Sequence, residues 1–288
     1  MHACGHDGHI ATLLGAAILL SRFQRPERNV RFLFQPAEET NPDGAPGFIA
    51  TGALDGLDAV YGFHLNATSD FGKVGWYDGA VMSGTIGCRI TIIGKKGHPA
   101  YPEACVNPIG ILSRILVELD SIKQTVRSTR PFLIAPQSFV SGEDMGTSTP
   151  EKATLTLRSA CLEEEVRDHV VDRIKAIATT IAELHGAKAE IEVMEAFPIT
   201  YNDPSLGGNV RECADLLGFQ QENIFPSMGS DDFAYYVEKV PAYYMTFGIR
   251  KGADFPIAHT PHFDFDEAIL PIASAEFAAC ALNLPPNR

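Results

Sequence analysis

The sequence has no closely paired cysteines and no long hydrophobic run, and each absence limits what the protein can be. Its six cysteines are scattered over 288 residues, and no two of them form a CxxC pair. A disulfide framework is therefore not expected, and a reducing cytoplasm fits this cysteine usage better. The apolar run at residues 10–20 is too short to cross a bilayer, and nothing around it resembles a signal peptide. We therefore expect no membrane partner.

Positive charge is also scarce. The chain has 23 lysines and arginines against 36 acidic residues, a formal net charge of −13 and a pI of about 5.1. Proteins that bind nucleic acid usually present a basic face, so this composition argues against a nucleic-acid partner. It says nothing against a small-molecule substrate. The length is enough for one or two domains with a substantial core.

The first nine residues concentrate groups that bind metals. Cys4, His6 and His9 lie within six positions, with a glycine between each pair. Thiolate and imidazole are good ligands for a divalent transition metal, although a short Cys/His tract alone could also be a polar chain end. Apolar residues at helical spacing predict a helix over residues 8–23, so the tract is expected at a helix N-terminus. His9, inside that helix, is more simply explained as a surface histidine or as a support for a ligand.

Two further candidate groups follow predicted strands. Residues 29–35 alternate in hydrophobicity and predict a strand, and Glu38 and Glu39 come directly after it. Residues 59–65 predict a second, buried strand that ends at His64. Open α/β sheets tend to place ligand sites at the carboxyl ends of their strands. Adjacent acids are usually only solvated, but beside a metal one carboxylate could ligate while the other moves a proton.

The middle of the chain has the pattern of a separate domain. From about residue 83 to residue 196 the predicted elements follow the order β-α-β-β-α-β, which is that of the ferredoxin-like split unit. The strands are predicted over 85–94, 132–140, 153–159 and 189–193, and the helices over 106–126 and 163–185. A glycine-flanked histidine, His98, follows the first of these strands. It is either a turn residue or a group that reaches a ligand held by the other domain.

The remainder of the chain supplies one more ligand candidate. A helix is predicted over 204–217, another beginning near 229–233, a strand over 242–248 and a last helix over about 267–283. His259 lies before the last helix, with His262 three residues further on.

Six segments, in this order, resemble the M20 metallopeptidase superfamily. They are MHACGHDGH, FQPAEE, GFHL, GKKGHPAYPE, GSDDFAYY and AHTPHFDFDE. The nearest branch is that of the amidohydrolases of N-acyl amino acids, such as hippurate hydrolases and indole-acetyl-amino-acid hydrolases. The resemblance implies an α/β fold with a zinc-peptidase-like mixed sheet flanked by helices. It also implies that residues 1–82 and 197–288 form the catalytic domain, and that 83–196 form an inserted ferredoxin-like lid and dimerisation domain.

The resemblance also implies a site with two divalent metal ions. Its ligands would be Cys4, His6, Glu39, His64 and His259. Glu38 would be the general base and acid, and His98 would contact the substrate. Manganese or zinc is expected, with cobalt or nickel as further options, because the thiolate favours zinc while carboxylate and imidazole allow manganese. A homodimer formed through the inserted domain is also expected.

Three departures from the family pattern concern activity. The family has a segment with a DxDALP-like motif before the Cys/His tract, and no such segment precedes Met1 here. Residues 147–150, Thr-Ser-Thr-Pro, replace an NVIP-like stretch. Residues 66–68 after His64 also differ from the family continuation. In the last motif, His262 stands where a basic residue is common, and the motif register favours His259 as the ligand.

Three functions therefore stay open. The first is a metal-dependent amidohydrolase of N-acyl amino acids, which the thiol in the CGHDGH segment favours. The second is a dipeptidase or carboxypeptidase of the same superfamily. The third is an inactive chain that only binds metal or dimerises.

Overall fold

The computed structural model describes residues 1–23, 26–40, 43–142 and 146–283, so the last five residues of the predicted catalytic domain lie outside the described part. The chain divides into two compact units. The first contains Met1–Val81, Thr200–Pro226 and Asp231–Arg288, and the second contains Met82–Ile199 and Ser227–Ser230.

A four-stranded mixed sheet forms the centre of the first unit. Its strand order is β1-β10-β2-β9. The strands are β1 (Val60–Asp70), β10 (Ala242–Arg250), β2 (Val74–Trp76) and β9 (Gln221–Asn223). β1 and β10 are parallel, β10 and β2 are antiparallel, and β2 and β9 are parallel. Almost every side chain of β10 is buried, as in strands that are covered on both faces.

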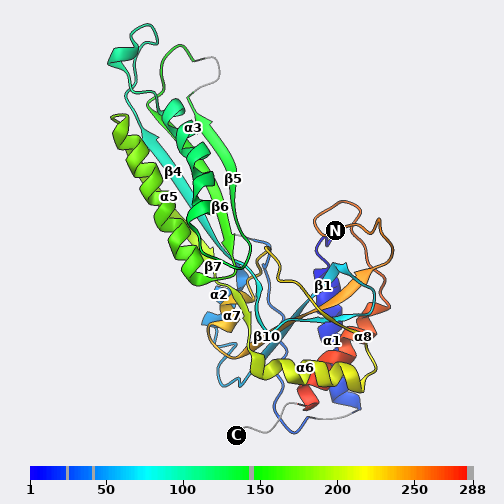
Figure 1. Ribbon diagram of the computed structural model, residues 1–288. Helices are drawn as coiled ribbons and strands as arrows, with labels where there is room; N and C mark the ends of the chain where they lie inside the picture. The colour runs from blue at the N-terminus through cyan, green and yellow to red at the C-terminus, as the bar shows by residue number, and fades with distance from the viewer. Residues whose placement is uncertain (24–25, 41–42, 143–145, 284–288) are drawn as a thin grey trace. The chain divides into compact units, whose positions relative to one another are not determined.

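Three helices pack side by side along this sheet. They are α1 (His6–Arg22), α8 (Ile269–Asn283) and α6 (Pro204–Leu216), and Figure 1 shows α1 next to α8 and α8 next to α6. The sheet, with its flanking helices, confirms the predicted α/β class. One stripe of α1 stays uncovered: Ile10, Leu14 and Ile18, four residues apart, are 54%, 53% and 41% exposed. The buried face of the helix consists of Gly8, Thr12, Ala16 and Leu20.

The strand predicted over residues 29–35 is wrong. These residues form no regular secondary structure, and no backbone hydrogen bond joins them to another segment of the described chain. Their alternating pattern matches a strand, but a strand also needs a neighbour for its N–H and C=O groups. β1, the edge strand of the sheet, pairs with β10 and not with these residues.

β1 also differs from its prediction, since it continues beyond residue 65 to Asp70. His64 therefore lies within the strand and not at its carboxyl end. Smaller elements complete the unit. They are α2 (Gly44–Ala50), α7 (Ala234–Val237) and a two-stranded sheet of β3 (Gly79–Met82) and β8 (Thr200–Asn202). The helix predicted from residues 229–233 is thus a single turn that begins at Ala234.

The second unit contains a four-stranded antiparallel sheet with helices packed against it. The strand order is β5-β6-β4-β7. Its elements along the chain are β4 (Gly84–Ile93), α3 (Pro108–Glu118), α4 (Ile122–Thr125), β5 (Phe132–Ser141), β6 (Lys152–Cys161), α5 (Glu164–Leu184) and β7 (Lys188–Phe197). Short 3-10 turns at 102–104 and 119–121 lie between these elements, and the second of them divides the helix predicted over 106–126.

The core of this unit lies between the sheet and the long helices α3 and α5, which run beside each other in Figure 1. Alternate residues of β4, such as Cys88, Ile90 and Ile92, point into it. The assignment of the unit to a ferredoxin-like domain with a lid or dimerisation role stays a prediction. Within the described ranges, no helix is both long and apolar enough to span a membrane.

Candidate metal centre

The turn that starts α1 directs Cys4 and His6 toward the same region. Gly5, between them, has a φ of 80°, a left-handed conformation that glycine adopts without strain. Its amide donates to the carbonyl oxygen of His2 over 3.1 Å, and the helix begins at His6. The thiol of Cys4 then lies 3.3 Å from Nε2 of His64 on β1.

Backbone contacts of β1 orient the imidazole of His64. Its Nδ1 lies 2.7 Å from the carbonyl oxygen of Leu65. Because a carbonyl can only accept, Nδ1 carries the proton and Nε2 keeps its lone pair toward Cys4. The Leu65 amide donates to Nε2 of His9 over 3.2 Å, and the rings of His9 and His64 pack edge to face with centroids 4.6 Å apart. His9 therefore supports His64 from behind. Burial and the neighbouring His64 hold the pKa of His9 well below its usual value, which keeps it a neutral acceptor.

Glu38 and Glu39 lie on one turn and face different histidines. Oε2 of Glu38 is 3.5 Å from Nε2 of His6, and Oε1 of Glu39 is 2.8 Å from Nε2 of His259. His259 has a left-handed backbone with a φ of 63°, and its amide donates to the carbonyl oxygen of Ala3 over 2.7 Å. The last motif of the chain is thus fixed to the first.

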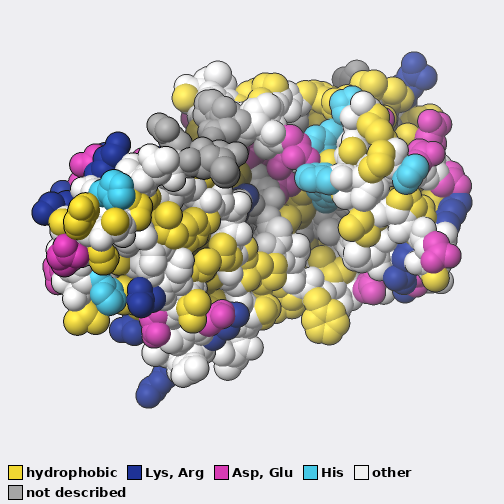
Figure 2. All heavy atoms as spheres, turned by 90° about the horizontal axis from the view of Figure 1, so that it is seen from above, with side chains coloured by type: hydrophobic (Ala, Val, Ile, Leu, Met, Phe, Trp, Pro, Cys, Tyr) yellow, Lys and Arg dark blue, Asp and Glu magenta, His cyan; other side chains and the backbone are white. Residues whose placement is uncertain are grey.

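These side chains form one connected group, which we call the donor cluster: Cys4, His6, Glu38, Glu39, His64 and His259. Ligand atoms lie within 4.8 Å of one another in three overlapping sets: Cys4, His6 and His64; Cys4, Glu39 and His259; His6, Glu38 and Glu39. A thiol, three imidazoles and two carboxylates suit a divalent transition metal. Figure 2 shows histidine side chains gathered beside acidic ones on one face.

The charges within the donor cluster favour a bound cation. Burial, followed by the charges of Asp231 and Glu39, raises the pKa of Glu38 to about 8. Burial, followed by the charge of Glu39, raises the pKa of the Cys4 thiol to about 12. Burial and the neighbouring His64 lower the pKa of His6, which keeps its ring in the neutral form that ligates. A divalent cation would reverse the two upward shifts, since it stabilises thiolate and carboxylate. The residues therefore fit a metal site.

Two acids that the sequence analysis did not select lie beside Glu38. Asp231 and Asp232 precede α7, and one oxygen from each lies within 4.8 Å of a Glu38 oxygen and of each other. Asp231 accepts hydrogen bonds from the Tyr244 hydroxyl and the Phe233 amide. The segment GSDDFAYY was a usable signal, but its acids were interpreted only as helix caps.

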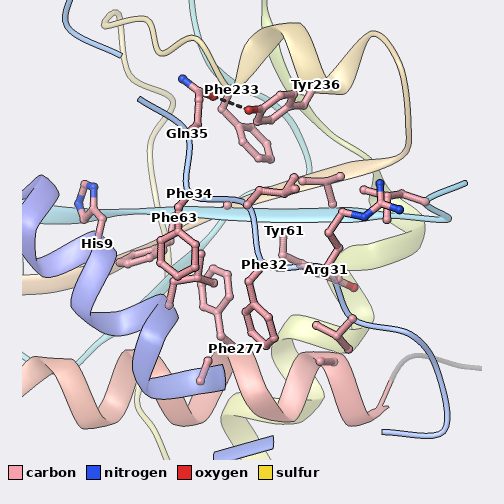
Figure 3. A pocket seen from close by; sticks show the side chains of 18 of the residues that line it. His9, Arg31, Phe32, Phe34, Gln35, Tyr61, Phe63, Phe233, Tyr236 and Phe277 are labelled. Carbon is pink, nitrogen blue, oxygen red and sulfur yellow. Dashed lines mark hydrogen bonds between the residues drawn. The ribbon is translucent and has the colours of Figure 1, made fainter. Parts of the chain in front are cut away.

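The donor cluster borders a large cavity, shown in Figure 3. Its volume is about 1280 Å³, and His6 and Glu38 belong to its lining. The rings of Phe32, Phe63 and Phe277 gather along it. Pockets for small ligands usually measure roughly 300–1,000 Å³, so a small substrate would fill only part of this space.

His98 lies in the second unit, on the loop after β4. Its Nδ1 accepts a hydrogen bond from the Ala100 amide over 3.1 Å, and its ring centroid is 5.8 Å from that of Tyr101. These contacts fix the histidine within its own loop. Its contact with a substrate stays a prediction.

Comparison with known proteins identifies the family. Residues 1–283 match the profile described as peptidase family M20/M25/M40. The chain belongs to this family. An N-acetylcysteine deacetylase of Bacillus subtilis is 32% identical to this M20 chain over 98% of its length and 73% of the relative. Thermostable carboxypeptidase 2 of Saccharolobus solfataricus is also 32% identical, with the same coverage.

A solved structure leads to the same family. The crystal structure of the Bacillus subtilis YXEP protein, described as a dinuclear metal-binding peptidase from the M20 family, matches with a TM-score of 0.85. Its sequence is 30% identical, and the match covers 98% of this M20 chain and 72% of that one. The M20 chain is therefore a metal-dependent hydrolase of amide bonds that acts on a small molecule and uses divalent metal ions.

Proposed function

We propose that this M20 chain hydrolyses the amide bond of N-acyl amino acids and releases the acid and the amino acid. The position of Glu38 carries the proposal: its carboxylate lies 3.5 Å from His6, inside the donor cluster and on the border of the cavity. The 32% identity to an N-acetylcysteine deacetylase supports an N-acyl amino acid as the substrate class.

The donor cluster divides into ligands and a proton carrier. The ligands are Cys4, His6, Glu39, His64 and His259, and they would hold two divalent cations, manganese or zinc before cobalt or nickel. Bound cations would acidify the attacking water and polarise the scissile carbonyl. His98, from the second unit, would hydrogen-bond the substrate and help to stabilise the developing oxyanion.

Glu38 would move the proton. It accepts a proton from the attacking water and returns it to the leaving amine. Burial and neighbouring acids raise the pKa of Glu38 from 4.5 toward about 8, while nearby cations act in the opposite direction. Between these limits a carboxyl group can both accept and return a proton near neutral pH.

A second candidate function is that of a carboxypeptidase or dipeptidase. The 32% identity to the Saccharolobus solfataricus carboxypeptidase supports it. Both candidates use the same chemistry on an amide bond, so the difference lies in the substrate. An inactive chain that only binds metal is the third possibility, and the experiment below separates the three.

We also propose a homodimer formed through the second unit, in the cytoplasm. The edge strands β5 and β7 each pair with a neighbour on one side only among the described strands, so an edge is available for association. All six cysteines are free, as a reducing compartment would keep them.

The test compares the 288-residue chain with a Glu38→Gln variant. Metal content is measured first, and hydrolysis is then followed on N-acetyl amino acids, including N-acetylcysteine, and on unblocked dipeptides and longer peptides. We expect about two metals per chain in both proteins, and a rate on N-acetyl amino acids that falls by roughly 10²–10⁴-fold in the variant. Faster cleavage of the peptides would favour the carboxypeptidase. Bound metal without turnover of any substrate would refute both enzymatic functions.

A further inference from the structure

The turn that carries Glu38 and Glu39 has a narrow base. The amide of Gly44 donates to the carbonyl oxygen of Ala37 over 3.0 Å, and a Cβ at position 44 would lie only 1.8 Å from the carbonyl oxygen of Pro36. Only glycine allows the two sides of the base to approach this closely. Ala37 has a φ of 66°, a left-handed conformation that costs a non-glycine residue roughly 1–3 kcal/mol. Contacts from outside the turn must therefore hold this conformation.

Asp232 provides such contacts on both sides of the turn. Its Oδ2 accepts a hydrogen bond from Nε2 of Gln35 over 2.6 Å and another from the amide of Ala45 over 3.0 Å. Gln35 precedes the turn and Ala45 follows it. One carboxylate oxygen, almost two hundred residues away in sequence, thus joins the two sides of the base.

The surroundings make these contacts strong. Asp232 is 2% exposed and Ala45 is fully buried, so water does not compete for the hydrogen bonds. Gln35 is itself oriented, because the Tyr236 hydroxyl donates to its Oε1 over 2.5 Å, as Figure 3 shows. The ring of Tyr236 packs edge to face against Phe233, with centroids 5.5 Å apart, so that the hydroxyl has a fixed origin.

We propose that Asp232 is a positioning residue, which fixes the turn bearing Glu38 and Glu39 through Gln35 and Ala45. This role rests on the function proposed above, in which Glu39 ligates metal and Glu38 moves the proton. Loss of the Asp232 acceptor would let both carboxylates move away from His6 and His259, and this would weaken metal binding.

The test uses two substitutions at one position. Asp232→Asn keeps an oxygen that can accept from Gln35 and Ala45 but removes the charge, whereas Asp232→Ala removes the acceptor. Mn²⁺ binding to the 288-residue chain is measured by calorimetry. We expect Asp232→Ala to lose about 10–100-fold in affinity, the range typical of groups that orient a metal ligand, and Asp232→Asn to stay within about threefold of the parent. An equal loss in both variants would mean that the charge matters, as for a direct ligand, and would overturn the proposal.

A matched pair of tyrosines covers the case in which Asp232→Ala does not fold. Tyr236→Phe removes the hydroxyl that orients Gln35. Tyr61→Phe removes a hydroxyl from the lining of the same cavity, where it is bonded to Asn209, away from the turn. We expect Tyr236→Phe alone to weaken Mn²⁺ binding, by several-fold. The same affinity in both variants would count against the proposal.

Hydrogen exchange at residues 37–39 gives a readout that needs neither metal nor substrate. We expect these amides to exchange faster in Asp232→Ala or Tyr236→Phe than in Asp232→Asn or Tyr61→Phe. If the parent chain binds no metal and cleaves nothing, the proposed function fails, and exchange alone decides whether Asp232 holds the turn. Unchanged exchange in every variant would overturn the positioning role.

Discussion

The backbone amide of His259 donates to the carbonyl oxygen of Ala3 over 2.7 Å, which joins the last motif of the chain to the first. His259 meets this bond with a left-handed backbone, and its side chain then reaches 2.8 Å from Glu39. Strained conformations of this kind persist where the surrounding structure fixes them, and they are common at functional sites. The donor cluster therefore depends on a contact between segments that are remote in sequence.

The first prediction separates the two histidines of the last motif. His259→Asn should weaken Mn²⁺ or Zn²⁺ binding by at least about 10–100-fold, since even groups that only support a ligand have effects of that size. Asparagine is chosen because it tolerates a positive φ better than most residues. His262→Asn is the matched control and should bind metal like the parent.

The measurement is the rise in melting temperature when metal is added, and its reversal by a chelator. Metal that binds only the folded state at 1,000 times its Kd stabilises that state by about 4 kcal/mol. A lost thermal shift in His262→Asn with a retained shift in His259→Asn would show that the motif register was wrong.

The second prediction concerns His9. His9→Ala removes the acceptor for the Leu65 amide and the ring that packs on His64, so metal affinity should fall by about 10–100-fold. His9→Gln keeps an acceptor at a similar reach and should lose less. Calorimetric titration of both variants with one metal provides the comparison, and equal affinities would remove His9 from the support of His64.

The third prediction concerns pH and Glu276, a buried acid on α8. Its side chain is 0% exposed, and Oε2 has no hydrogen-bond partner among the described residues. Burial, followed by the charge of Cys213, raises the pKa of Glu276 from 4.5 to about 8. Between these values the unfolded chain releases a proton that the folded chain keeps. Glu276 therefore makes the free energy of unfolding fall as pH rises, by up to about 1.4 kcal/mol per pH unit.

Glu276→Gln removes this contribution. The stability of the parent relative to the variant should be greatest near pH 4.5 and should decline up to about pH 8, as measured by urea denaturation across that range. Asp172→Asn, at an exposed acid on α5, is the control and should follow the parent. A constant difference between Glu276→Gln and the parent at all pH values would show that Glu276 titrates normally in the folded state.

The fourth prediction concerns residues 29–35. Their amides have no backbone partner in the described chain, so they should exchange with solvent with almost no protection. Amides of β10, paired on both sides and buried, should exchange roughly 10³-fold or more slowly. Exchange followed by mass spectrometry resolves both peptides. Comparable protection in the two would mean that residues 29–35 form a strand in solution.

Periodicity predicted much of this fold, because the helices and most long strands bury one face or one continuous run. α5, predicted over 163–185, forms over Glu164–Leu184, and the strand predicted over 242–248 forms β10. The same reasoning failed for 29–35, since alternation describes how a strand would bury its side chains but not whether a neighbouring strand exists.

The candidate site shows a similar limit. The residue types of the six donors suggested a metal, but their convergence depends on long-range contacts such as that of His259 with Ala3. Asp232 was interpreted as part of a helix cap because its partners, Gln35 and Ala45, lie almost two hundred residues earlier. No local pattern encodes such a bond.

The uncovered stripe on α1 has a consequence for how the protein behaves as a colloid. Ile10, Leu14 and Ile18 present three branched side chains in one row, each at least two fifths exposed. A continuous apolar strip of this kind attracts other apolar surfaces, while the net charge of −13 keeps copies of the chain apart. Salt screens that repulsion but leaves the strip unchanged. The chain should therefore stay dispersed in dilute, low-salt buffer and cluster reversibly as ionic strength rises.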